Sequence, residues 1–188
     1  TKQDFIDVVT EGQPTAPGYF SFDAGLNKAR RALLDESETT TQLSLDEVLA
    51  RQQAGAVVVD TRDAAQFAAG HVRGSVNVGL DGRFAEYVGT VVTPERPVVL
   101  VTDPGTESEA RVRLGRIGYD DVVGVLRDTY TALADNGESV ERSSRLTAAE
   151  LDRAIDEHSD LALIDVRNPG ETALGIIDGA LTIPLAQL

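Results

Sequence analysis

The sequence contains no cysteine among its 188 residues. This absence excludes disulfides, thiolate metal sites and any cysteine-nucleophile mechanism within the chain. The sequence also has no signal-peptide pattern and no apolar run close to the roughly 20 residues that a membrane-spanning helix needs. We therefore expect a cytoplasmic protein that does not enter a membrane. Because the first residue is Thr1 rather than methionine, we expect a fragment or a processed chain.

Positive charge is scarce: 17 lysines and arginines face 31 aspartates and glutamates, which gives a net charge of −14. An acidic surface disfavours binding to nucleic acids and to anionic membranes. We expect metabolic or protein partners instead. The protein partners would be neighbouring domains of a longer polypeptide, with a homo-oligomer as an alternative. The length suits one complete domain plus part of another.

Residues 1–36 are predicted to form two short helices. The first covers the apolar residues around Phe5, and the second begins at a cap at Asp23 and continues to Leu34, with a break before Tyr19. Two such helices cannot bury a core, so we expect them to pack on the next domain or on a part of the protein outside this chain. The polar residues 37–41 are interpreted as a linker.

Residues 42–140 have the pattern of one complete α/β domain. Ser44 and Glu47 form a capping box at the start of its first helix. Further helices are predicted at 64–69, 84–88, 107–117 and 129–133, and apolar strands at 56–59, 76–78, 98–101 and 122–125. Helices that alternate with such strands predict a central parallel sheet with helices on both faces.

The strand at 98–101 leads into a loop at the place where open α/β sheets usually carry their functional groups. The loop consists of Thr102, Asp103, Pro104, Gly105, Thr106, Glu107 and Ser108. It has no cysteine, histidine or basic residue, and Glu107 and Glu109 bring negative charge to the start of the next helix, where an anion would otherwise be attracted. The simplest interpretation is a solvated acidic turn, and the alternative is a Ca²⁺ or Mg²⁺ site formed with Asp103.

The chain also repeats itself, with paired positions 105 residues apart. Asp60, Arg62, Gly70 and Gly74 are echoed by Asp165, Arg167, Gly175 and Gly179. A second capping box, Thr147 with Glu150, precedes the second set. We therefore interpret residues 145–188 as the opening of a second copy, in which the position matching Thr102 would fall near 207.

The repeated segments resemble the opening motif of rhodanese-like domains. The residues that carry the resemblance are 58–62 (VVDTR) and 67–78 (FAAGHVRGSVNV), with 164–167 (IDVR) and 175–185 in the second copy. The resemblance covers about residues 42–188. It implies the rhodanese fold, with Asp60, Arg62, Gly70, His71 and Gly74 as structural motif positions.

In that family a loop of the form Cys-x-x-Gly-x-Arg-Ser carries the sulfur chemistry. Alignment on Gly105 and Ser108 places Thr102 at the cysteine position and Glu107 at the arginine position, and a shift by one residue places Asp103 at the cysteine position. Neither residue is a thiol, and a carboxylate cannot carry sulfane sulfur. The resemblance therefore implies a degenerate site with no catalytic residue.

Residues 1–36 also resemble the carboxyl-terminal end of metallo-β-lactamase-fold hydrolases of the glyoxalase II and persulfide dioxygenase type. The resemblance rests on residues 4–5, 17–20 and Asn27. Such enzymes occur fused to rhodanese domains, which implies a parent protein that binds Zn or Fe through a preceding domain. Their His-x-His-x-Asp-His motif is absent here, so we expect neither metal nor cofactor in this chain.

The remaining polar candidates have structural interpretations. His71 is expected to stabilise a turn rather than bind a metal, and His158 to end a helix. The Asp60–Arg62 and Asp165–Arg167 pairs are expected to be structural ion pairs rather than active-site groups.

Three hypotheses follow. This chain is a non-catalytic rhodanese-like module in a sulfur-metabolism enzyme. Alternatively, it is the inactive part of a metal-dependent hydrolase or persulfide dioxygenase whose sulfurtransferase activity lies elsewhere. The third hypothesis is a cation sensor built on the acidic loop, which predicts a melting shift with millimolar Ca²⁺.

Overall fold

The computed structural model describes residues 1–11, 19–26, 28, 34–36, 38–134 and 137–187. The chain divides into two units. One comprises Gly18–Arg145, and the other comprises Thr1–Pro17 together with Leu146–Leu188. We call them the central unit and the flanking unit. No helix of the described residues is long and apolar enough to cross a membrane.

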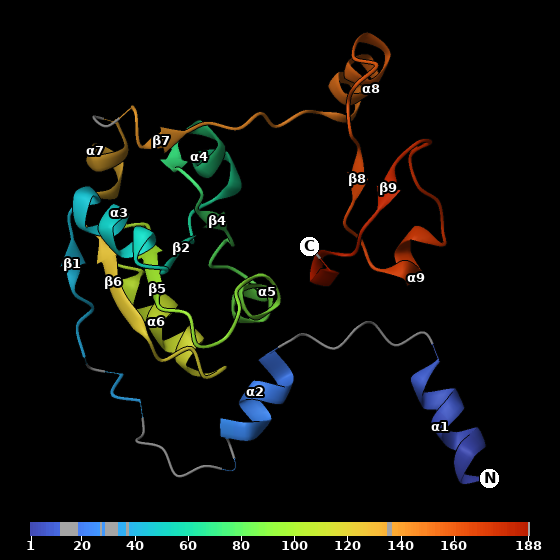
Figure 1. Cartoon of the computed structure of the whole chain (residues 1–188), viewed down its shortest axis with the longest axis horizontal. Coiled ribbons are helices and arrows are strands. Elements are labelled where there is room, and N and C mark those ends of the chain that lie inside the picture. The colour runs from blue at the N-terminus through green and yellow to red at the C-terminus, as the bar shows by residue number, and fades with distance from the viewer. Residues whose placement is uncertain (12–18, 27, 29–33, 37, 135–136, 188) are drawn as a thin grey trace. The chain divides into compact units, whose positions relative to one another are not determined.

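The central unit is built on a five-stranded sheet in the order β1-β6-β5-β2-β4, in which every neighbouring pair is parallel (Figure 1). The strands are β1 (Gln42–Leu43), β2 (Val57–Asp60), β4 (Val76–Asn77), β5 (Val98–Val101) and β6 (Val122–Leu126). The helices are α2 (Tyr19–Leu26), α3 (Leu45–Gln53), α4 (Ala64–Ala69), α5 (Phe84–Val91), α6 (Glu107–Gly115) and α7 (Thr129–Ala134). The predicted α/β class with a parallel sheet is confirmed.

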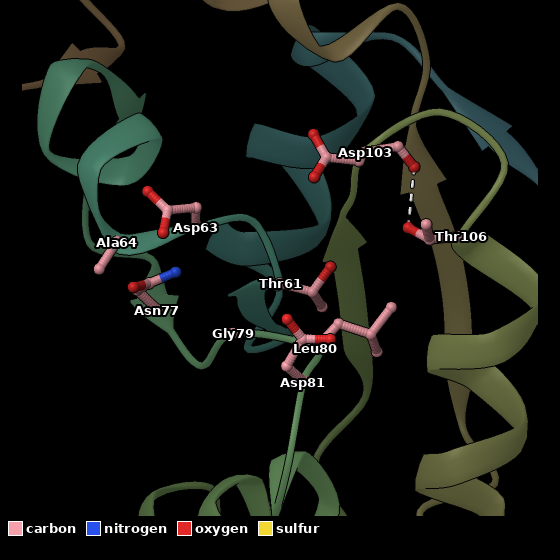
Figure 2. Close-up of a pocket in the computed structure, with 9 residues that line it drawn as sticks. All are labelled: Thr61, Asp63, Ala64, Asn77, Gly79, Leu80, Asp81, Asp103 and Thr106. Atoms are coloured by element: carbon pink, nitrogen blue, oxygen red, sulfur yellow. Dashed lines mark hydrogen bonds between the residues drawn. The ribbon is translucent and has the colours of Figure 1, made fainter.

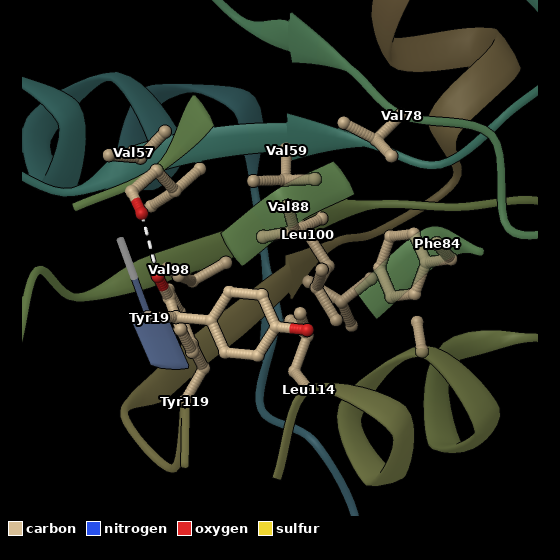
Figure 3. Packing of buried hydrophobic residues seen from close by; sticks show 13 residues of the cluster. Tyr19, Val57, Val59, Val78, Phe84, Val88, Val98, Leu100, Leu114 and Tyr119 are labelled. Atoms are coloured by element: carbon tan, nitrogen blue, oxygen red, sulfur yellow. Dashed lines mark hydrogen bonds between the residues drawn. The ribbon is translucent and has the colours of Figure 1, made fainter. Parts of the chain in front are cut away.

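The sheet is buried on both faces because its strands carry unbroken apolar runs. Val59 and Leu100 point into one cluster, which α2, α5 and α6 cover (Figure 3). Val58 and Val99 point into the other, which α3 and α7 cover. All four side chains have 0% exposure. Because side chains alternate along a strand, neighbouring apolar residues of one strand enter two different clusters.

Three short strands of the central unit were not predicted: β1, at the edge of the main sheet, and two strands outside that sheet. Strands β3 (His71–Val72) and β7 (Val140–Glu141) pair antiparallel outside the main sheet. Each has two residues, too few to show a period in the sequence. This pairing joins the end of the central unit to the segment between α4 and β4.

The prediction for the second amino-terminal helix was wrong in its position. Helix α2 begins at Tyr19, and Asp23 lies inside it rather than at its cap. The cause is tertiary packing: Tyr19 is 6% exposed and lies in the core cluster. A Cβ on Gly89 of α5 would stand 2.2 Å from Cδ1 of Tyr19, so the close approach requires glycine. The remainder of the predicted helix, 27 and 29–33, lies outside the described residues.

Residues 35 and 38, on either side of the start of the predicted linker at 37–41, contact α6 within the central unit. Arg111 of α6 donates to the carbonyl oxygen of Asp35 at 2.5 Å and lies 3.6 Å from the carboxylate of Glu38. Arg111 itself is 6% exposed. The expectation that the amino-terminal segment packs on the next domain therefore holds for α2 and for residues 35 and 38.

Tyr119 is expected to make the stability of the central unit decrease at high pH. It is buried in the same cluster, and its hydroxyl donates to the carbonyl oxygen of Val92 at 2.6 Å. Burial, with a smaller contribution from Tyr19, raises the pKa of Tyr119 to about 12.

Because the phenol ionises more readily in the unfolded chain, its contribution to stability is intact below about pH 10 and is lost as the pH rises toward about 12. We expect Tyr119→Phe to flatten this decline. Urea unfolding at several pH values would test it, and an equally steep decline in the variant would contradict it.

The flanking unit contains α1 (Lys2–Thr10), α8 (Ala148–Glu157), α9 (Pro169–Thr172) and the turn Leu185–Gln187. Its strands β8 (Ile164–Asp165) and β9 (Leu181–Thr182) form a two-stranded parallel sheet.

Both predicted capping boxes are present. Ser44 with Glu47 begins α3 of the central unit, and Thr147 with Glu150 begins α8 of the flanking unit. His158 is the C-cap residue of α8, as expected for a helix end.

Candidate functional site

The loop after β5 turns tightly, and some of its backbone groups form hydrogen bonds within the loop. Gly105 has φ +88°, a conformation that favours glycine. The hydroxyl of Thr106 donates to the carbonyl oxygen of Asp103 at 2.8 Å. The backbone N–H of Gly105 donates to the carboxylate of Glu107 at 3.2 Å, and Pro104 has no N–H to offer. The backbone at positions 104 and 105 therefore offers no free amide donor to a ligand.

The two candidate nucleophile positions differ in accessibility. Thr102 is 2% exposed, and its carbonyl oxygen accepts from the hydroxyl of Thr129 at 3.0 Å. Asp103 instead lines a pocket beside the loop. The sequence left open whether Thr102 or Asp103 occupies the cysteine position of the family loop. Of the two, Asp103 lies where a ligand could reach it.

The pocket lies where strands β2, β4 and β5 end and has a volume of about 450 Å³ (Figure 2). Three carboxylates from three segments line it: Asp63, Asp81 and Asp103. The other lining residues are Thr61, Ala64, Asn77, Gly79, Leu80 and Thr106. No lysine, arginine or histidine is among them, so the pocket repels anions.

Sequence reasoning missed Asp63 and Asp81. The available signal was their position shortly after β2 and β4, since the carboxyl ends of parallel strands meet at one edge. Arg113 of α6 fixes the segment that carries Asp81. It donates to the carbonyl oxygens of Leu80 and Gly82, the latter at 2.5 Å.

Tyr130 of α7 is a further residue that the sequence did not reveal. Its hydroxyl donates to the carboxylate of Asp103 and accepts from the amide nitrogen of Gln66 at 2.7 Å. The hydrogen bond to Asp103, followed by burial, raises the pKa of the Tyr130 phenol. Tyr130 therefore joins the loop to α4 and neutralises no charge there.

Asp60 and Arg62 form a buried ion pair, and Arg62 also donates a hydrogen bond to the backbone. Nη2 of Arg62 lies 2.6 Å from Oδ2 of Asp60 and also donates to the carbonyl oxygen of Gly70 at 2.9 Å. The two residues are 0% and 3% exposed. They join the end of β2 to the end of α4 and do not line the pocket.

Asp165 and Arg167 reproduce this geometry in the flanking unit. Nη2 of Arg167 lies 2.6 Å from Oδ2 of Asp165 and donates to the carbonyl oxygen of Gly175 at 2.8 Å. This hydrogen bonding lowers the pKa of Asp165 and raises the pKa of Arg167. The predicted correspondence between the two sets of residues therefore extends to their hydrogen bonds.

The other motif positions have local roles. Nδ1 of His71 lies 2.8 Å from the carbonyl oxygen of Phe67, and its ring stacks on that of Phe67 with centroids 3.7 Å apart. Gly74 and Gly179 have φ of +70° and +82°. His71 is thus a buried residue of β3 whose ring contacts the end of α4, while both glycines occupy positions that favour glycine.

The cation-sensing hypothesis finds no ligand set here. The carboxylates of Asp103 and Glu107 bond to Tyr130 and to the loop backbone, and Glu109 lies 3.4 Å from Arg113. Across the described ranges, no three histidine or carboxylate side chains gather as metal ligands would. The melting shift with Ca²⁺ stays an untested prediction.

The central unit is thus an α/β domain that carries a loop and a pocket at the carboxyl edge of a parallel sheet. Residues 44–136 match the model of the family described as Rhodanese-like domain. That part of the chain is a rhodanese-like domain. No curated protein is detectably similar in sequence to the chain.

Three solved structures are similar to this chain. A metallo-beta-lactamase from Staphylococcus aureus subsp. aureus COL is 24% identical over 67% of this chain, with a TM-score of 0.56. Wild-type EanB is 18% identical over 81% of the chain, with a TM-score of 0.50. A thiosulfate sulfurtransferase from Pseudomonas aeruginosa has 22% identity, a TM-score of 0.40 and 79% coverage. The chain spans 35%, 42% and 35% of these proteins respectively.

Proposed function

We propose that the central unit is a rhodanese-like domain without sulfurtransferase activity, which serves as a structural or interaction module. The observation that carries this proposal is the acidic pocket beside a loop that has no thiol. Sulfur transfer from thiosulfate requires a nucleophile that accepts sulfane sulfur and an environment that tolerates an anion. Thr102 is buried, and Asp103, Asp63 and Asp81 give the pocket negative charge.

We further propose that the parent protein is a fusion in which a metallo-β-lactamase-fold domain precedes this one and residues 145–188 open a second rhodanese-like copy. The likeness to a solved metallo-beta-lactamase, over 35% of its length, supports the fusion at the level of fold alone. The repeated ion pair supports the second copy. Hydrolase or persulfide dioxygenase activity, with Zn or Fe, would then belong to other parts of the parent.

The described residues of this chain do not fit such a metal, because no three potential ligands gather among them. The partners we propose are neighbouring domains, or a second copy of the chain, in the cytoplasm. Neither nucleic acid nor membrane suits its charge of −14.

The test is thiosulfate-to-cyanide sulfur transfer by the purified chain. We expect no turnover by the native chain. Asp103→Cys with Glu107→Arg would place a thiol at the pocket and remove two carboxylates, one of which lines the pocket. This double variant should therefore gain turnover and a mass increase of one sulfur atom. Thr102→Cys with Glu107→Arg should gain less, because position 102 is 2% exposed.

Ser144→Cys, at an exposed position away from the loop, controls for nonspecific thiol chemistry. Turnover by the native chain would show a nucleophile other than cysteine and would overturn the proposal. A gain in Ser144→Cys equal to that in the Asp103 variant would show that the pocket contributes nothing.

A further inference from the structure

The neutral polar side chains that line the pocket of Figure 2 use their donors within the protein. The hydroxyls of Thr61 and Thr106 donate to backbone carbonyl oxygens at 3.3 and 2.8 Å. Nδ2 of Asn77 donates to two backbone carbonyl oxygens, both at 3.0 Å. Thr61 is 4% exposed, so the fold fixes the place of its oxygen. The groups of these side chains that remain for a ligand are therefore oxygen acceptors.

The three carboxylates of the pocket add acceptors that carry a full charge. Asp63, Asp81 and Asp103 come from separate segments, and Figure 2 shows their carboxylates around one open space. Asp63 accepts from the N–H of Ala65 at 2.7 Å, and Asp103 accepts from the hydroxyl of Tyr130. Both donors are neutral, so the negative charges remain. Asp81 makes no side-chain hydrogen bond or ion pair with any residue that the structure describes.

The arrangement of the lining selects among cations. Over the described residues, no three carboxylates gather as the ligands of one metal ion would. The volume of about 450 Å³ suits a small organic molecule, and Ala64 and Leu80 add apolar surface to the lining. An alkylammonium group has three donors and no acceptor, which matches a lining of acceptors. Two such groups on one short aliphatic chain would reach carboxylates of different segments, while the chain covers the apolar part.

We infer that this pocket binds a linear aliphatic diamine, with one ammonium group at Asp81 and the other at Asp63. The inference goes beyond the proposed function and does not depend on it, because the same contacts would hold the diamine whether or not the loop transfers sulfur. It also differs from the cation-sensing hypothesis, which places a metal ion on the loop carboxylates rather than an organic cation across the pocket.

The test is calorimetric titration of the full chain with the diamines from 1,3-diaminopropane to 1,6-diaminohexane. The salt concentration is about 0.1 M, which screens charges more than about 10 Å apart. The tightest diamine should bind about tenfold more tightly than the monoamine of the same length, because the second ammonium group meets a second carboxylate. Mg²⁺, which has the same charge and no aliphatic chain, should not displace it. Amide chemical shifts should change at residues 61–64, 77–81 and 103–106.

Three substitutions that each remove one negative charge locate the site. Asp81→Asn should weaken diamine binding by about tenfold, because it deletes a charge that faces the ligand. Asp63→Asn should weaken it to a similar degree, and asparagine still caps α4. Asp121→Asn is the matched control at an exposed residue just before β6, at the opposite edge of the sheet. It should change the affinity by less than about twofold.

Absence of binding by every diamine would overturn the inference. Equal affinities for diamine and monoamine, displacement by Mg²⁺, or an equal loss in Asp121→Asn would show attraction by net charge alone and would overturn it too. Sulfur transfer by the native chain would contradict the proposed function and leave the diamine site standing. A native chain that neither transfers sulfur nor binds a diamine would contradict the diamine site alone.

Discussion

Asp60→Ala is expected to lower the free energy of unfolding of the central unit by about 3–5 kcal/mol, the range for removing one partner of a buried ion pair. The substitution leaves the guanidinium of Arg62 buried at 3% exposure without its carboxylate. It also removes the acceptor for the backbone N–H of Arg62, which donates to Oδ1 of Asp60 at 3.0 Å. The carbonyl oxygen of Gly70 remains as an acceptor but carries no full charge.

The repeat supplies a matched control. Asp165→Ala removes the same hydrogen bonds, but Arg167 is 45% exposed and water can solvate it. The loss should therefore be clearly smaller, as for solvent-exposed ion pairs in general. Asp60→Asn, which keeps the shape and part of the hydrogen bonding, should fall between the two.

Urea unfolding followed by near-ultraviolet circular dichroism would measure these effects. All four tyrosines lie in the central unit, and the chain has no tryptophan, so the signal reports that unit. For Asp165→Ala, amide exchange across β8–β9 is the corresponding measure. A loss for Asp60→Ala no larger than for an exposed ion pair would mean that the buried pair does not hold the end of β2.

The sequence was sufficient for four of the five strands of the central sheet, because these strands and their helices have clear local patterns; the two-residue strand β1 was not predicted. The prediction for residues 98–101 matches β5, and the prediction for residues 64–69 matches α4. The repeat identified Asp60 and Arg62 as a pair before any geometry was known. Such features depend on residues near one another in the chain, where propensity and periodicity are informative.

The rest depended on contacts between distant segments. Asp63, Asp81 and Asp103 come together because β2, β4 and β5 end at one edge, and Tyr130 reaches Asp103 from a helix 27 residues later. Sequence alone identified the loop of the candidate site but not the other segments that form its pocket. The start of α2 was misplaced for the same reason, because Tyr19 is helical where it can pack on α5.

The second large effect on stability is expected from the packing of α2 on the central unit. Tyr19→Ala should lower the free energy of unfolding of the central unit by about 3 kcal/mol, the lower end for loss of a buried aromatic side chain. Tyr19 is 6% exposed in a cluster that includes Phe84, Val98 and Leu114 (Figure 3). Phe20→Ala, at a neighbouring residue that is 53% exposed, is the matched control and should change stability by about 0.5 kcal/mol or less.

The partner of Tyr19 is open to a reciprocal test. Gly89→Ala would place a Cβ 2.2 Å from Cδ1 of Tyr19, and overpacking of this kind costs about 1–3 kcal/mol. Once Tyr19 is alanine the clash is gone, so the loss in the double variant should fall short of the sum of the single losses by about 1 kcal/mol or more. Urea unfolding of the four proteins, followed by far-ultraviolet circular dichroism, completes the cycle.

Additive losses would mean that α2 does not rest on α5. Coupled losses would place α2 within the folding unit, as the division at Gly18 does. A boundary drawn from sequence at residue 42 would then cut through the hydrophobic core, because it separates Tyr19 from the glycine whose missing side chain makes room for it. The segment before β1 would then contribute to the stability of the rhodanese-like domain, because α2 helps to cover one face of its sheet.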